Sequence, residues 1–89
     1  MATHKSAEKR ARQTLVRNAI NRTRRSQIHI KVKAVDAAVA SGDQAAAVKA
    51  ARSAESTLAR IAGRGTIHWK TAARRTSRLA KRVKKMKAA

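Results

Sequence analysis

The sequence contains no cysteine, no proline, no phenylalanine and no tyrosine, and it has a single tryptophan. Without cysteine there can be no disulfide, no thiol catalysis and no thiolate metal site. Without proline, the three glycines are the only strong helix breakers. No apolar run approaches the length of a membrane span, and the N-terminal residues lack the apolar segment of a secretory signal. These absences favour a helical protein that does not enter a membrane, and they fit a reducing cytosol without requiring one.

Acidic residues are also scarce, with 4 Asp and Glu against 23 Lys and Arg in 89 residues. The net charge of +19 disfavours a compact chain unless a polyanion neutralises it. Each acid has a structural interpretation, either as the partner of a cation one helical turn away or as a helix cap: Glu8 with Arg12, Asp36 with Lys33, Glu55 with Arg52, and Asp43 as the cap. A paired-carboxylate active site is therefore not expected, and we predict that the protein is not an enzyme.

Histidines offer no alternative chemistry. His4, His29 and His68 are far apart, and no cysteine or nearby carboxylate completes a metal-binding spacing. We therefore expect no metal, no cofactor and no small-molecule substrate. His68 opens a predicted helix, where backbone N–H groups and the helix dipole favour an anion.

Alanine makes the hydrophobic content of 43% misleading, because 21 of the residues are alanine. Alanine is the best helix former, yet it buries little apolar area. The sequence should therefore form helices readily and pack them thinly. We predict that the free protein is weakly stable and becomes fully ordered on its partner.

The glycines divide the chain into three predicted helices, at about residues 6–40, 43–62 and 67–86, within one domain spanning 1–89. Gly42 has the place of a left-handed C-cap, and Asp43 that of the next N-cap. After Gly63 and Gly65, Thr66 is the candidate cap of the third helix.

Apolar residues recur at helical rather than strand spacing. The expected packing stripes are Ile28, Val32, Val35 and Val39 in the first helix; Val48, Ala51, Leu58, Ile61 and Ala62 in the second; and Trp69, Ala72, Ala73, Thr76, Leu79, Ala80, Val83 and Met86 in the third. A separate stripe comprises Leu15, Val16, Ala19 and Ile20. Trp69 has two interpretations, because the sole aromatic residue can anchor the core or stack on an unpaired base beside His68 and Lys70.

Helix lengths then predict the architecture. At about 1.5 Å per residue, the first helix would reach about 50 Å and the others about 30 Å. Short connections favour antiparallel neighbours, so the shorter helices cover only the C-terminal part of the first. We predict an all-α, antiparallel three-helix bundle whose long first helix projects N-terminally as an arm.

Charge is distributed unevenly along these helices. Residues 1–33 carry a balance of +9, residues 34–63 a balance of zero, and residues 64–89 a balance of +10. The second helix should therefore provide packing, while the outer two face a polyanion. Arginine outnumbers lysine by 13 to 10, which suits bidentate contacts with phosphate.

Several motifs are distributed along the chain: Lys5-Ser6-Ala7, Lys9-Arg10 and Arg12-Gln13 at the start, the run Asn21 to Ser26, Ala37-Ala38 with Gly42-Asp43, and, most specifically, Gly65-x-Ile67-His68 with Ala72-Ala73-Arg74 and Ser77-Arg78-Leu79. These motifs resemble those of the bacterial small-subunit ribosomal protein S20 family. The resemblance covers essentially the whole chain. Trp69 is a departure, because the family commonly has lysine there, and Leu15-Val16 replaces a more polar stretch.

The resemblance implies a three-helix protein that binds small-subunit (16S) rRNA early in assembly, in the cytoplasm, with few protein neighbours and without catalysis. Together, the resemblance and the charge pattern predict these RNA-binding residues: Lys5, Ser6, Lys9, Arg10, Arg12, Gln13, Arg17, Asn21, Arg22, Arg24, Arg25, Ser26, His68, Lys70, Arg74, Arg75, Ser77, Arg78, Lys81 and Arg82. Two alternatives share the basic helices, a DNA-compacting protein and a membrane-active peptide precursor. Charge surrounds the first helix and leaves no wide apolar face, which argues against the membrane alternative.

Overall fold

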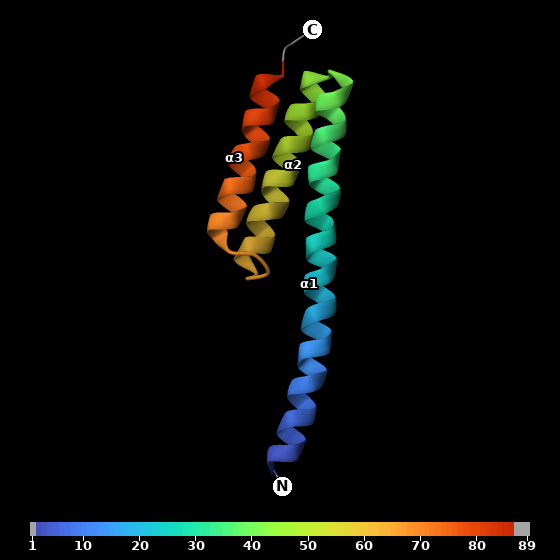
Figure 1. Ribbon diagram of the computed structural model, residues 1–89, viewed down its shortest axis with the longest axis vertical. Coiled ribbons are helices and arrows are strands. Elements are labelled where there is room, and N and C mark those ends of the chain that lie inside the picture. The colour runs from blue at the N-terminus through green and yellow to red at the C-terminus, as the bar shows by residue number, and fades with distance from the viewer. Residues whose placement is uncertain (1, 87–89) are drawn as a thin grey trace.

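A computed structural model describes the backbone of residues 2–86 and the side chains of residues 4–86. It contains three α-helices, α1 (Ala2–Ser41), α2 (Gln44–Gly63) and α3 (Trp69–Lys85). Figure 1 shows α2 between the other two and antiparallel to both, so that the helices lie side by side. The principal-axis extents are 69 × 21 × 13 Å, which describe a long, flat molecule. The prediction of an all-α, three-helix bundle with a long first helix is confirmed.

The connection between α1 and α2 follows from its own two residues, Gly42 and Asp43. Gly42 adopts the left-handed conformation, with φ of +79°, and its N–H donates to the carbonyl of Val39. Asp43 then caps α2, because its carboxylate accepts a hydrogen bond from the Ala46 N–H at 3.1 Å. Both predicted capping roles are confirmed, and the chain reverses direction within two residues.

The connection between α2 and α3 differs from its prediction. Thr66 does not cap α3. His68 occupies the N-cap position, and its Nδ1 accepts a hydrogen bond from the Lys70 N–H at 3.1 Å. The third helix consequently begins at Trp69, two residues after the predicted start. The hydroxyl of Thr66 faces α1 instead, so a tertiary contact takes it away from the helix end.

The core is thin and centred on α2. The fully buried side chains of greatest volume are Leu58 and Ile61 of α2 and Val35 of α1. The other buried core residues are Ile28, Ala47, Ala54, Thr57, Ala72, Leu79 and Val83. Most stripe positions predicted from the sequence are therefore buried or half-buried, but Ala73 and Ala80 are exposed. Three of the buried core residues are alanines, so little apolar area leaves water.

Trp69 is the clearest correction to the predicted core. Its side chain is 65% exposed, although its spacing had favoured a place on the packing stripe of α3. Because α3 begins at this residue, the indole lies at the end of the helix pair formed by α2 and α3. The helical period places Trp69 on the face of α3 that packs against α2. It does not indicate that α2 ends at this level.

The N-terminal half of α1 projects beyond the bundle, as predicted (Figure 1). Every side chain from residue 4 to residue 20 is exposed, and we call this segment the arm. The stripe of Leu15, Val16 and Ile20 lies outside the buried core, and these side chains remain 70%, 60% and 43% exposed. Within residues 2–86, no helix has an apolar stretch long enough to cross a membrane.

Candidate nucleic-acid interface

One face of α1 presents polar and cationic side chains from the arm into the bundle. Residues three and four apart lie above one another on a helix. Such steps bring seven residues around one shallow groove: Asn18, Asn21, Arg22, Arg25, Ser26, His29 and Ile30. Arg22, Arg25 and Ser26 are exposed, so their polar groups are free to meet an RNA backbone.

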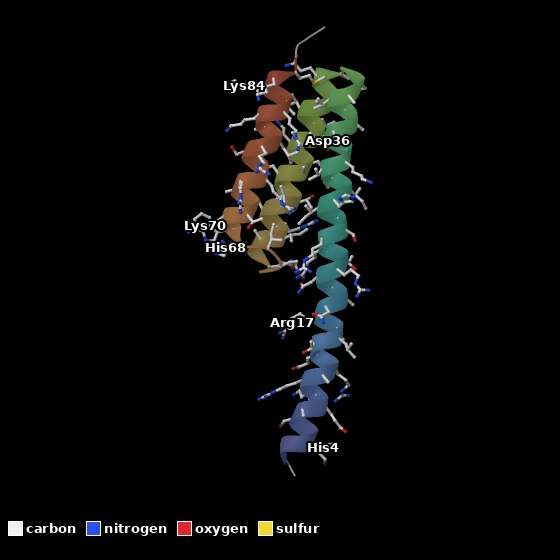
Figure 2. The ribbon with its side chains drawn as sticks, in the orientation of Figure 1. His4, Arg17, Asp36, His68, Lys70 and Lys84 are labelled. Atoms are coloured by element: carbon white, nitrogen blue, oxygen red, sulfur yellow. The ribbon has the colours of Figure 1, made fainter. Side chains whose placement is uncertain are left out.

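A second face of the arm carries another group of cations. Its groove is lined by Lys9, Arg12, Gln13, Val16, Arg17, Ile20, Asn21 and Arg24. In Figure 2, Arg17 extends from α1 on the side on which α2 and α3 lie. The remaining predicted arm residues, Lys5, Ser6 and Arg10, are also exposed. The arm therefore offers cations on more than one face, and an RNA can contact it from several directions.

A third cationic group forms where the arm meets the end of α2. Arg24 of α1 lines a cavity of about 350 Å³ together with Arg60 and Arg64, which come from the C-terminal end of α2 and the residue after it. Arg60 and Arg64 are exposed and were not among the predicted RNA-binding residues. The zero charge balance of residues 34–63 concealed Arg60. The available signal was the position of Arg60 and Arg64, four residues apart on either side of the helix-ending Gly63.

Two of the predicted RNA-binding residues also hold the fold together. The Thr66 hydroxyl donates to Asn21 Oδ1 at 3.0 Å and accepts from Arg24 Nη1 at 3.1 Å. These partly buried hydrogen bonds join the α2–α3 loop to α1, at the point where the arm leaves the bundle. A loss of RNA binding on replacing Asn21 or Arg24 would therefore mix contact loss with loosening of this junction.

The predicted residues of α3 and of its N-cap are all exposed: His68 at the cap, then Lys70, Arg74, Arg75, Ser77, Arg78, Lys81 and Arg82 along the helix. Figure 2 shows Lys70 near the beginning of α3 and Lys84 near its end. No acidic residue lies in this helix. Because α2 lies between α1 and α3, the two cationic helices occupy opposite edges of the flat molecule (Figure 1), although Arg82 of α3 reaches Asp36 of α1.

The acidic residues pair differently from the sequence-based expectation. Asp36 Oδ1 contacts Arg82 Nη1 of α3 at 2.6 Å rather than Lys33, and Glu8 contacts His4 Nε2 at 3.3 Å rather than Arg12. No ion pair of Glu55 occurs within the described part of the chain. Both observed pairs are at least half exposed, so each contributes at most about 1 kcal/mol. The Asp36–Arg82 pair partly neutralises one predicted RNA-binding cation.

Metal chemistry has no support in this geometry. Among the side chains of residues 4–86, no three His, Cys, Asp or Glu residues gather closely enough to hold an ion. The surface is instead suited to a polyanion, because its exposed groups are guanidinium, ammonium, amide and hydroxyl donors.

Comparison with known proteins decides the family. The family model described as ribosomal protein S20 matches residues 2–84. The chain belongs to the ribosomal protein S20 family. Among its relatives, the small ribosomal subunit protein bS20 of Paramagnetospirillum magneticum is 51% identical over 98% of this chain and 97% of its own length. The bS20 proteins of Chelativorans sp. and Maricaulis maris are 49% and 48% identical, over 99% of this chain and all of theirs.

Membership in the S20 family confirms the resemblance read from the motifs. A ribosomal-protein family is a structural one, so the prediction that this chain is not an enzyme is confirmed as well. The match extends over the arm, the bundle and all of α3 except its last residue. The cationic arm is therefore part of the family's fold rather than an extension added to it.

Proposed function

We propose that this protein binds 16S rRNA directly and holds separate RNA elements together while the small ribosomal subunit assembles. Its bS20 relatives are small ribosomal subunit proteins, and this chain, as a member of their family, is a structural part of that subunit in the bacterial cytoplasm. The observation that carries the proposal is the position of two strongly cationic helices on opposite edges of a flat molecule, with α2, whose charge balance is only +2, between them (Figure 1).

The geometry supports a bridging role rather than binding along one RNA groove. Because α2 packs against both neighbours, it fixes the spacing of α1 and α3. The arm extends beyond the bundle, so it reaches RNA that the bundle does not touch. Phosphates near α1 and phosphates near α3 would then belong to different RNA segments, which the protein holds at a fixed separation.

We assign the phosphate and ribose contacts to the exposed predicted residues of the arm and of α3, and we add Arg60 and Arg64 at the junction. Arginine suits these positions because its planar guanidinium donates two parallel hydrogen bonds to a phosphate. Since cations cover so much of the surface, we expect RNA rather than protein to be the main neighbour. The whole chain acts as one RNA-binding domain.

A binding titration tests the proposal. The protein is titrated with 16S rRNA, unrelated RNA of equal length and duplex DNA, at low and moderate salt. If about 8–12 phosphates are engaged, the logarithm of affinity falls against the logarithm of salt with a slope of about −6 to −10. We expect selective binding of 16S rRNA that persists at moderate salt. A slope shallower than about −3 would contradict the proposal, and equal binding of all three would favour the DNA-compacting alternative.

A matched pair of variants separates local contacts from net charge. Arg22→Ala with Arg25→Ala removes two exposed cations from the outer face of α1. Lys49→Ala with Arg52→Ala removes the same charge from exposed positions on the weakly charged α2. The first variant should have a salt slope shallower by about 2, one unit for each lost phosphate contact, whereas the second should bind like the parent. Equal losses in both variants would mean that net charge alone drives binding.

A further inference from the structure

Trp69 is a large apolar side chain that the fold leaves uncovered. Its indole is 65% exposed, and it is the only aromatic ring in the protein besides the histidines. Its immediate neighbours are polar. The Lys70 ammonium lies over the ring at 5.6 Å from its centroid, and the His68 ring lies with its centroid 5.6 Å away, tilted by 30°. Exposing an indole loses the free energy that its burial would provide, so the fold itself gains little from tryptophan here.

A groove of about 660 Å³ runs from the indole along the seam between α2 and α3. It is lined by Glu55, Ala59, Ala62, Gly63, Trp69, Ala72, Ala73, Thr76 and Ser77. The walls are mainly alanine and glycine, so a flat group can approach the helices closely. No lysine or arginine lines the groove, in contrast to the two grooves of α1. A phosphate is therefore not its natural occupant.

We propose that Trp69 stacks on an unpaired nucleobase and that the groove receives this base. The inference rests on the proposed function, and it names the RNA feature that the start of α3 recognises. Sequence-specific recognition of RNA uses unpaired bases, which stack on aromatic rings and expose their hydrogen-bonding edges. Thr76, Ser77 and Glu55 supply hydroxyl and carboxylate groups at the groove for such an edge.

The surrounding charges favour a nucleotide over the apolar side chain of a protein partner. Lys70 lies beside the indole, and Arg74 and Arg75 follow it, exposed, on the next turn of α3. These cations suit the phosphates on either side of a bound base, whereas Glu55 repels phosphate from within the groove. The phosphates of the RNA would therefore contact the cations of α3, while the unpaired base enters the uncharged end of the groove beside the indole.

Tryptophan fluorescence of the full-length protein reports on this site alone, because no other residue in the sequence is tryptophan or tyrosine. Addition of 16S rRNA should quench the emission and protect it from acrylamide. A fully paired RNA of equal length, bound at low salt, should leave the emission nearly unchanged, because it offers no unpaired base. Quenching by the paired RNA equal to that by 16S rRNA would overturn the proposal, since it would report nearby phosphate rather than stacking.

Substitutions provide the second measurement, made by titrating labelled 16S rRNA. Trp69→Leu keeps an apolar side chain and removes the aromatic ring, and it should weaken binding by about 5- to 150-fold, the range for one stacked base. Trp69→Phe should retain most of the affinity. Trp69→Lys adds a cation but should still bind less tightly than Trp69→Phe. Circular dichroism should show the same helix content in all three variants, because the indole is exposed.

The outcomes separate this inference from the proposed function. If the parent binds 16S rRNA selectively but Trp69→Leu binds equally well and the emission does not change, stacking is refuted while direct rRNA binding stands. A Trp69 surface that docks a protein would give this same result. If the parent itself shows no selective binding, both proposals are overturned.

Discussion

At the scale of single residues, the junction between arm and bundle depends on the hydroxyl of Thr66. One hydroxyl accepts from Arg24 and donates to Asn21, so it ties the α2–α3 loop to α1 through two partly buried hydrogen bonds. Few other side-chain hydrogen bonds link α1 to the rest of the bundle. One of them joins α1 to α2, where Lys31 Nζ donates to Ser53 Oγ at 2.9 Å. Thr66 therefore supplies the loop's side-chain hydrogen bonds to α1, beside Ile67, which packs against the core.

Replacing Thr66 with alanine should lower the free energy of unfolding by about 1–2 kcal/mol, because two partly buried hydrogen bonds are lost. Thr23→Ala is the matched control. Thr23 is exposed and donates only to the carbonyl of Ala19 in its own helix, so its loss should be neutral or slightly stabilising. Urea unfolding followed by circular dichroism measures both. Equal effects of the two substitutions would contradict the tie between loop and α1.

Leucines at two depths provide a second prediction. Leu58 is 1% exposed in the core, whereas Leu15 is 70% exposed on the arm. Leu58→Ala should cost about 2–5 kcal/mol, which in a core this thin removes most of the stability. Leu15→Ala should change the free energy of unfolding by less than about 0.5 kcal/mol. Thermal melts of the two variants are compared with the parent, and a large loss from Leu15→Ala would show that the arm packs against something in the free protein.

Residues whose roles are local could be predicted from the sequence, and residues whose roles are tertiary could not. Gly42 and Asp43 act on atoms within a few residues of themselves, so their types and order were sufficient. Thr66 has the right type and place for a cap, yet its hydroxyl meets α1 some 45 residues away in sequence. Trp69 has the right period for the core, but burial depends on where α2 ends.

At the scale of elements, the arm combines high helix propensity with no tertiary support. Helices in proteins owe most of their stability to packing, and the arm has only its continuity with the packed half of α1 to support it. The arm also places cations such as Lys5, Lys9 and Arg12 within one turn of like charges, which repel one another. Its helix is therefore the part of the fold that gains most from neutralisation by RNA.

Hydrogen exchange should reveal this difference between elements. Backbone amides of residues 4–20 should exchange quickly in the free protein, at a rate close to that of an unfolded chain. Amides of α2, whose Ala54, Leu58 and Ile61 are buried, should exchange much more slowly. Binding of 16S rRNA should slow exchange in the arm. Equal protection of the arm and α2 in the free protein would contradict the prediction.

The sequence predicted the helices well because apolar spacing and helix-breaking residues act locally, within one helix or one connection. Alanine content and the glycine positions indicated three helices, and the stripe containing Ile28 and Val35 indicated the face of α1 that packs. The cluster of Arg24, Arg60 and Arg64 depends on the level at which α2 ends against α1. No periodicity within one helix contains that information, so the junction was missed.

At the scale of the whole molecule, a charge of +19 acts against the fold that carries it. Within residues 4–86 one ion pair, the exposed Asp36–Arg82 contact, offsets the repulsion, and the exposed His4–Glu8 contact adds to it only when the histidine is protonated. Salt weakens such pairs, but it also screens the much larger number of repulsive interactions. The screening length falls from about 10 Å at 0.1 M to about 3 Å at 1 M ionic strength. Repulsion should dominate, because cations outnumber acids in the sequence by 23 to 4.

The free protein should therefore become more stable as potassium chloride is added, and the midpoint of thermal unfolding should rise.

Removing cations by substitution should also raise the midpoint at low salt, and the size of the rise should depend on where in α3 the cations are removed. Arg74→Gln with Arg75→Gln removes two cations from the second turn of α3, beyond the reach of the helix dipole. Lys84→Gln with Lys85→Gln removes equal charge from the last turn, where the dipole favours cations. The first variant should melt higher than the second at low salt, and the difference should shrink at high salt. A midpoint that falls as salt is added would mean that the ion pairs outweigh the repulsion, and the thin alanine-rich core would then be sufficient without a polyanion.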